Sequence, residues 1–264
     1  MLTEKSEDDR SSGGTRPRGR PPKYPPEQVR ERLIDSGIEA LRNNGVEIGL
    51  DAVALDAAII DAEVPRGMSY RIWQDSELSP QNALRREVVL KLLSLPTTSG
   101  VQATRDRATE FLAEYGPIDK SDPASRERAI SEMTRVVGGF NHVLLDDSEE
   151  WRLYKALRSA ALTRESTESP EILELLRKGE DLIIDEYSKL FAETARMFGL
   201  QLRSEYTIEQ FAAAAHAAND GLIARLSGKY ERRDIMRRDS EGTLAEWTLF
   251  SISLEALIKQ FFEI

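Results

Sequence analysis

Apolar residues in this chain recur at intervals of three and four from residue 25 to the C-terminus. One example is Val29, Leu33, Gly37, Ala40 and Leu41, and side chains at such intervals share one face of a helix. Proline and glycine clusters interrupt the pattern at several points. We find no run in which polar and apolar residues alternate for long enough to make a strand. The sequence therefore predicts an all-α fold.

The composition narrows the chemistry available to this fold. The chain has no cysteine, and its two histidines, His142 and His216, belong to no His-x-x-x-His or Glu-x-x-His grouping. Disulfides, thiolate metal sites and cysteine nucleophiles are therefore excluded, and we expect no bound metal and no cofactor. Carboxylates at 146–147 and 149–150 lie near His142, which leaves a carboxylate-based enzyme as an alternative. No phosphate-binding glycine loop or nucleophile elbow accompanies them, and we expect no enzymatic activity.

Hydropathy and charge bear on the location of the protein and on whether it can bind nucleic acid. Its apolar runs are short and broken by charge, and the first ten residues, MLTEKSEDDR, lack the apolar stretch of a signal peptide. We therefore expect no membrane segment and a cytoplasmic location. The formal net charge of −10 opposes nucleic-acid binding. The charge is uneven, however, because residues 16–23, RPRGRPPK, carry four cations and no anion.

Three segments follow from these changes in composition. Residues 1–24 predict a flexible basic arm, residues 25–95 a helix-turn-helix domain, and residues 96–264 a larger helical domain for effector binding and dimerisation. The arm contains Pro17-Arg18-Gly19-Arg20-Pro21, which resembles an AT-hook that follows a narrow minor groove. A nonspecific tether to phosphates is the alternative. The candidate DNA-binding residues of the arm are Arg16, Arg18, Arg20 and Lys23.

Four helices are predicted in residues 25–95. The first starts at the prolines at 25 and 26 and stops at the Asn43-Asn44-Gly45 cluster. Two short helices follow, at about 51–60 and 65–73, and a longer one covers about 78–95 before the Pro96–Gly100 break. Three short helices before a longer one are typical of a helix-turn-helix domain.

The segment 52–73 carries the candidate recognition helix. Its first half supplies residues expected to pack the two helices together, namely Val53, Ala57, Ile60 and Val64. Its second half is short enough for its first turn to enter a major groove about 12 Å wide, where arginine can bind a guanine edge. The candidate DNA-binding residues are Pro65, Arg66, Gly67, Met68, Tyr70 and Arg71. The alternative is a buried helical hairpin without a role in DNA binding.

The run from Ala62 to Trp73, AEVPRGMSYRIW, resembles the turn and recognition helix of the TetR family of transcriptional regulators. Residues 206–222 are similar to the penultimate long helix of that family, which builds its dimer interface. The resemblance implies a homodimer that binds a palindromic operator on double-stranded DNA, most often as a repressor in the bacterial nucleoid. Glu63 stands where the family has glycine, and a non-glycine residue in a left-handed turn costs on the order of 1 kcal/mol.

Two apolar stripes near the C-terminus predict the dimer interface. Alanines around the first stripe would let helix backbones approach closely, and the last helix is apolar on more than one face. A purely intramolecular core is the alternative. The candidate interface residues are Phe211, Ala215, Ala218, Leu222, Trp247, Leu254, Ile258 and Phe261, and we expect Leu244 to continue the second stripe on the same helix.

The resemblance also implies a small-molecule effector that binds among the central helices and releases the protein from DNA. We expect the glycines at 138 and 139 to break a helix where a pocket can open beside His142. The second histidine, His216, is expected to be structural. The candidate ligand-binding residues are Phe140, His142, Trp151, Tyr154, Tyr187 and Phe191. A helical adaptor that binds another protein through its C-terminal helices is the remaining alternative.

Overall fold

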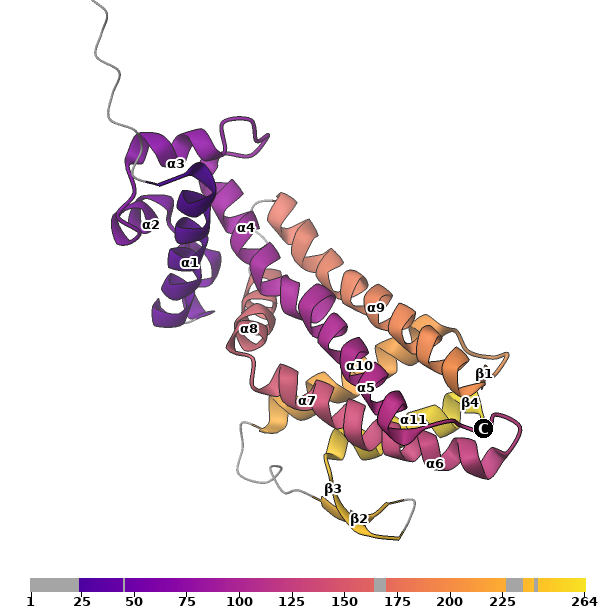
Figure 1. Ribbon diagram of the computed structural model, residues 1–264. Helices are drawn as coiled ribbons and strands as arrows, with labels where there is room; N and C mark the ends of the chain where they lie inside the picture. Colours follow the sequence, from indigo (N-terminus) through magenta and orange to yellow (C-terminus); the bar gives the residue numbers. More distant parts are fainter. Residues whose placement is uncertain (1–23, 45, 164–169, 227–234, 240–241) are drawn as a thin grey trace, which may run out of the picture.

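The fold was analysed in a computed structural model, which describes residues 24–44, 46–163, 170–226, 235–239 and 242–264 (Figure 1). The helices are α1 (Pro26–Asn44), η1 (Val46–Ala52), α2 (Leu55–Asp61), α3 (Arg66–Ile72), α4 (Pro80–Ser94), η2 (Leu95–Ser99), α5 (Gly100–Tyr115), α6 (Pro123–Met133), η3 (Thr134–Gly138), α7 (Gly139–Asp146), α8 (Glu149–Thr163), α9 (Pro170–Phe198), α10 (Ile208–Leu226) and α11 (Leu249–Phe261). The strands are β1 (Gln201–Leu202), β2 (Ile235–Arg238), β3 (Leu244–Trp247) and β4 (Phe262–Glu263).

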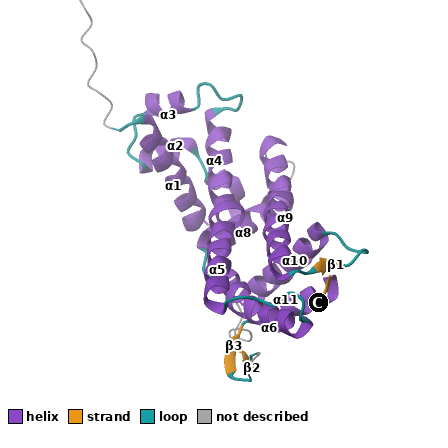
Figure 2. Ribbon diagram, turned by 45° about the vertical axis from the view of Figure 1, so that its right-hand side comes forward, coloured by secondary structure: helices purple, strands orange, loops and turns teal. Residues whose placement is uncertain are grey.

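The predicted all-α class is confirmed, although the described residues also include short strands that the sequence did not predict. Strand β1 pairs with β4 beside the end of α11, and β2 pairs with β3 in an antiparallel hairpin that projects from the helical body (Figure 2). Leu244 and Trp247 therefore lie in a strand, and the prediction that they belong to the last helix is wrong. That helix begins only at Leu249, where the Thr248 hydroxyl accepts a hydrogen bond from the Ser251 amide.

The N-terminal helices lie at one end of the elongated molecule, opposite the β2–β3 hairpin (Figure 1). Helix α1 has the predicted bounds, and α3 and α4 begin within two residues of their predicted starts. Helix α2 begins four residues later than predicted. The segment before it, Val46–Ala52, is a 3₁₀ helix that is kinked at Gly49, where φ is 64°. Glycine adopts this conformation without steric cost. Helix α2 starts only at Leu55 because Ala54, the residue before it, is extended (φ −105°, ψ 123°).

Helix α4 fixes the position of α2 and α1. The Gln81 side chain accepts a hydrogen bond from the Leu55 amide at 2.8 Å and donates one to the Val53 carbonyl at 2.6 Å. It thereby satisfies a free donor at the start of α2. Arg30 of α1 pairs with Glu87 of α4 at 2.5 Å. These contacts hold α1, α2 and the start of α4 as one unit.

Close packing of α1 on α4 depends on Gly37. A Cβ atom at this position would lie 2.8 Å from Val88 Cγ2 and 3.2 Å from Val53 Cγ1. We predict that Gly37→Ala lowers the free energy of unfolding by about 1–3 kcal/mol, because overpacking outweighs the gain in helix propensity. Gly67→Ala in α3 is the matched control. Nothing lies within 4 Å of that position, so this variant should be neutral or stabilised by up to about 1 kcal/mol in urea denaturation.

Two long helical runs form much of the body, and both contain a π-helical turn. Helices α4 and α5 are joined through η2, where the sequence predicted a break, and α6 and α7 are joined through η3. Gly138 and Gly139 keep helical dihedral angles, so the prediction of a helix break at this point is wrong. Their function is to allow close packing, because a Cβ at Gly138 would lie 3.1 Å from Leu254 of α11. Helical π-turns occur frequently at functional sites.

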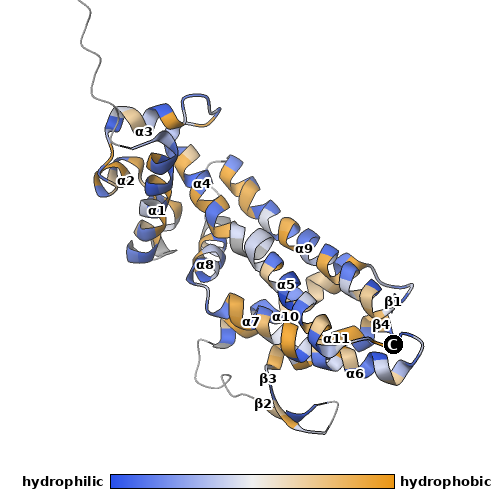
Figure 3. Ribbon diagram, in the orientation of Figure 1, coloured by the Kyte–Doolittle hydropathy of each residue, from blue (hydrophilic) through white to orange (hydrophobic). Residues whose placement is uncertain are grey.

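A continuous hydrophobic core extends from α1 through α4 and α8 to α9. Apolar and polar residues alternate around α9 along its whole length, as expected for a helix with one buried face (Figure 3). No helix in the described ranges combines the length and hydrophobicity needed to cross a bilayer.

Candidate functional site

The short helix α3 lies at the surface. It follows a turn in which Glu63 has a positive φ of 52°, as its position in the turn predicted. The side chains of Pro65, Arg66, Tyr70 and Arg71 are exposed, with Tyr70 at 43%. Within about one and a half turns, the helix therefore exposes two guanidinium groups and a phenol to solvent.

Buried residues fix α3 to the domain. Ser69 is fully buried, and the half-buried Met68 and Ile72 pack against the hydrophobic core. On the outer side, Arg66 pairs with Asp56 of α2 at 2.6 Å. Both partners are largely exposed, so this ion pair contributes little to stability. It holds the Arg66 guanidinium beside the start of α3.

Two residues that were expected to pack α2 against α3 do not do so. Ile60 is 78% exposed and Ala57 is also exposed, whereas Val53 and Val64 are buried as predicted. The remaining candidate DNA-binding residues, at 16, 18, 20 and 23, lie outside the described residues.

A partly open cavity lies between α5, η3, α9 and α11. The centre of a water-sized sphere can move through about 70 Å³ of it, which is room for several waters or a small organic group. Its wall is almost entirely apolar. The lining residues are Thr104, Ala108, Met133, Thr134, Val137, Gly138, Asn141, Tyr187, Leu190, Phe191, Thr194, Phe250, Leu254 and Ile258.

A buried hydrogen-bond network forms the polar end of this cavity. Asn141 donates to Thr104 Oγ1 and to the Tyr187 hydroxyl, both at 2.9 Å. Asn219 donates to Asn141 Oδ1 at 3.4 Å and contacts His142 Nδ1 at 2.5 Å. Burial raises the pKa of Tyr187 to about 12, so its hydroxyl keeps its proton and can donate it to an acceptor in the cavity.

Of the six candidate ligand-binding residues, Tyr187 and Phe191 line the cavity. Phe140 is exposed on α7 and does not line it. His142 is buried against Phe250 and Asn219, next to the cavity wall. The larger part of the wall was not predicted, because it combines side chains from four helices that are distant in sequence. Leu254 and Ile258, which the sequence assigned to a dimer interface, belong to this wall.

No protein-family model matches this chain, and no curated protein or solved structure matches it. The resemblance to TetR regulators therefore rests on residues 62–73 and 206–222.

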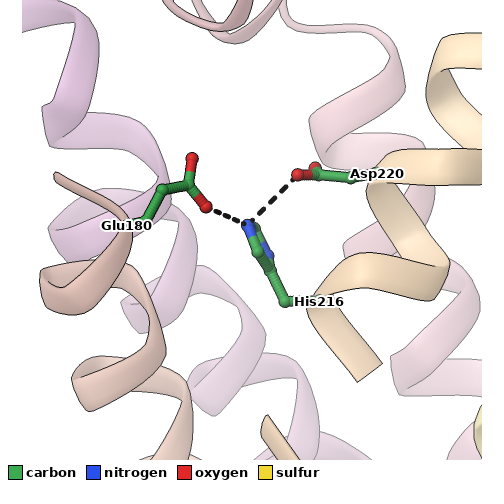
Figure 4. Close-up of side chains that lie close together, drawn as sticks. All are labelled: Glu180, His216 and Asp220. Carbon is green, nitrogen blue, oxygen red and sulfur yellow. Dashed lines mark ion pairs between the residues drawn. The ribbon is translucent and has the colours of Figure 1, made fainter. Parts of the chain in front are cut away.

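A second candidate site, partly buried, lies among α8, α9 and α10, and Figure 4 shows three of its side chains. The ring of His216 faces two carboxylates, with Nε2 at 3.3 Å from Asp220 Oδ2 and at 3.6 Å from Glu180 Oε2. Lys155 of α8 contacts both carboxylates, and Arg158 Nε lies 3.4 Å from Glu180 Oε1. We call these five residues the α8–α10 ionic cluster. Trp151 and Tyr154, two of the predicted ligand-binding residues, are buried beside it.

The positive charges of the cluster control the ionisation of Glu180. Burial alone would raise its pKa, but the nearby His216 ring, the hydrogen bond and charge of Lys155 and the charge of Arg158 lower the pKa to about 2. Only part of this cluster could be predicted from the sequence. His216 and Asp220 are four residues apart, which places both on one face of α10. Nothing in the sequence indicates that Glu180 and Lys155 join them.

This cluster predicts an acid sensitivity. A carboxylate whose pKa is lowered on folding contributes stability above its unfolded pKa near 4.5, and this contribution is lost as the pH falls toward 2. We expect Glu180 to account for a loss on the order of 3 kcal/mol over that range. Glu180→Gln should flatten the fall of the unfolding free energy between pH 5 and 2. Asp181→Asn, at the exposed neighbouring position, should keep the wild-type dependence of the unfolding free energy on pH. If both variants show the same dependence, Glu180 is not its cause.

The candidate dimer residues divide into two groups. Phe211, Ala215, Trp247 and Leu254 are buried by the chain itself. The others are half-buried: Ala218, Leu222, Ile258 and Phe261. The outer face of α10 instead carries the exposed small residues Ala213, Ala217 and Gly221.

Proposed function

We propose that this protein is a TetR-like transcriptional regulator, most simply a cytoplasmic repressor, which binds a palindromic operator as a homodimer. The observation that carries the proposal is the exposed position of α3 at one end of the molecule, with Arg66, Tyr70 and Arg71 directed outward. A short helix of this kind enters a major groove with its N-terminal turn, and arginine can bind a guanine edge through two hydrogen bonds. The role is one of binding, not of catalysis.

A homodimer is part of the proposal because one short helix reads too few base pairs. Two copies about 34–36 Å apart would reach successive major grooves on one face of the duplex. The exposed face of α10 supports such an interface. Ala213, Ala217 and Gly221 are spaced by four residues along it, and their small size lets a second helix approach closely. We assign the partner contact to this face, with Leu222 at its edge.

The cavity is the proposed effector site. It lies between α9 and α11 and the helical run that starts at α4, so a ligand that changes the packing of α5 on α9 would move the N-terminal helices with α4. The described residues of the wall carry no charged side chain, which suits a small neutral molecule. Release from DNA would then follow from a population shift between two arrangements of the N-terminal helices in the dimer.

Selection of bound duplexes from a random pool tests the proposal directly. We expect the full-length protein to enrich a twofold-symmetric sequence and light scattering to give the mass of a dimer at micromolar concentration. Weak retention that disappears in moderate salt, without an enriched sequence, would instead support a helical adaptor. A monomer would contradict the twofold arrangement.

The basic arm adds a separate prediction. Replacing Arg18 and Arg20 with alanine should weaken binding to the selected duplex and reduce the slope of log K against log salt by about 0.9 for each phosphate that the arm no longer neutralises. Fluorescence anisotropy at several salt concentrations measures this slope. If the slope does not change, the arm does not contact DNA.

A further inference from the structure

We propose that Glu180, His216 and Asp220 bind a divalent first-row transition-metal ion, with Zn²⁺ as the representative. The three residues come from α9 and α10 and face one another in the α8–α10 ionic cluster (Figure 4). This proposal is independent of DNA binding, because the metal is measured on the free protein.

The ligand atoms have nearly the spacing that one ion requires. One nitrogen and two carboxylate oxygens lie within 4.8 Å of one another, and the two contacts of His216 measure 3.3 and 3.6 Å. Metal–ligand bonds of about 2.0–2.2 Å in a tetrahedral arrangement place neighbouring ligand atoms about 3.4 Å apart. Closure by on the order of 1 Å between the two carboxylates would complete the three-ligand arrangement and leave a fourth position for water.

Several buried polar atoms at this point lack a hydrogen-bond partner in the described part of the chain. They include Nε2 of His216, whose side chain is only 6% exposed, and Oδ1 of Asp220. The Tyr154 hydroxyl and the Trp151 indole nitrogen are two further examples beside the cluster. Buried polar atoms without partners are uncommon in folded proteins, and four in one place require an explanation. A metal ion with its bound water would engage the imidazole, the carboxylates and the phenol together.

Packing at Gly179 brings the phenol to the site. A Cβ at this position would lie 2.2 Å from the Tyr154 hydroxyl oxygen, so only glycine leaves room for the ring. Burial raises the pKa of Tyr154, and the negative charges of Glu180 and Asp220 raise it further. The phenol therefore stays protonated, and we assign it to a hydrogen bond with the water on the ion.

Lys155 is the competitor of the ion. Its ammonium group lies 3.1 Å from Glu180 Oε1 and also contacts Asp220, so it balances the carboxylates in the absence of metal. It forms no hydrogen bond with His216 Nε2 in the described part of the chain, and its long side chain is 30% exposed. The lysine can therefore move to solvent when an ion enters. Imidazole favours Zn²⁺, Ni²⁺ and Co²⁺ over Mg²⁺ and Ca²⁺, which sets the expected selectivity.

Calorimetric titration of the chelator-treated, full-length protein with Zn²⁺, in a buffer containing excess Mg²⁺, tests this site. We expect one ion for each chain. His216→Ala and Glu180→Gln should each weaken binding by at least about 100-fold, whereas Asp181→Asn, the exposed neighbour on α9, should bind like the wild type. Lys155→Met should tighten binding, because it removes the competing ammonium group.

A second readout separates loss of the site from loss of the fold. Co²⁺ bound by one imidazole and two carboxylates gives visible absorption, which Asp220→Asn should abolish while its far-ultraviolet circular dichroism stays that of the wild type. The proposal is overturned by equal Zn²⁺ binding in the wild type and in Glu180→Gln. It is also overturned if only Lys155→Met binds, since the lysine would then be the permanent cation of this cluster.

Discussion

Replacing both Arg66 and Arg71 with alanine should reduce affinity for the selected operator by about 1000-fold. An arginine bound to a guanine edge contributes about 1–3 kcal/mol, and a dimer loses four such groups in the double variant. A loss of about 4 kcal/mol corresponds to three orders of magnitude in the dissociation constant. Stability should hardly change, because the ion pair that is removed, Arg66 with Asp56, is exposed. Fluorescence anisotropy with a labelled duplex measures the effect.

Two further variants make this test specific. Arg128→Ala removes one positive charge from α6, at the end of the body away from α3, and should bind DNA like the wild type (Figure 1). Asp56→Asn frees the Arg66 guanidinium from its ion pair and removes a negative charge near the phosphates, so its affinity should rise. If the double variant binds as tightly as Arg128→Ala, α3 is not the recognition helix.

The bounds of the N-terminal helices could largely be predicted from the local sequence pattern. Val29, Leu33 and Leu41 fall on one helical face, and all three are buried. The start of α2 could not be predicted, because Gly49 and the 3₁₀ turn depend on how Leu50 and Val53 dock against α1 and α4. The exposure of Ile60 was missed for a similar reason. Its spacing fits a buried face, but no helix packs over that side of α2 in the described chain.

The error at Leu244 and Trp247 arose because a single spacing of three residues is too short a pattern to define a helix. Residues three apart can share a helical face, but here they lie in a strand that pairs with Ile235–Arg238 and point to opposite sides of it, Leu244 exposed and Trp247 buried. The Arg237 guanidinium lies 4.6 Å from the centre of the Trp247 ring and covers it. Pairing with a distant strand is a nonlocal effect, which the periodicity of the local sequence does not record.

The cavity and the α8–α10 ionic cluster also depend on nonlocal packing, which local sequence patterns do not record. Tyr187 and Phe191 could be selected because aromatic residues often line pockets, whereas Thr134 and Gly138 carry no such signal and lie in the wall through a π-helical turn. The i, i+4 pair of His216 and Asp220 was visible in the sequence. Its carboxylate partner on α9 was not, since only the packing of α9 on α10 brings Glu180 within reach.

Phe211→Ala should lower the free energy of unfolding by about 3–5 kcal/mol. The Phe211 ring is buried and packs edge to face against Phe191, Phe261 and Phe262, with centroids 4.9, 5.4 and 5.1 Å away. Truncation leaves a cavity lined by three rings that cannot easily close it. Urea denaturation at several protein concentrations measures this loss, which should not depend on concentration because the contacts lie within one chain.

Ala217→Arg should leave the stability of the single chain unchanged and disrupt the proposed dimer. This residue is exposed one position after the buried His216, so a long charged side chain should change the stability of the single chain by less than about 0.5 kcal/mol. In a dimer packed through α10, two arginines would meet across the twofold axis, and the like charges and added volume would separate the subunits. Analytical ultracentrifugation should then show a folded monomer. If the variant remains dimeric, the subunit interface lies elsewhere. Such a dimer would still bind both half-sites together and should keep its affinity for the operator.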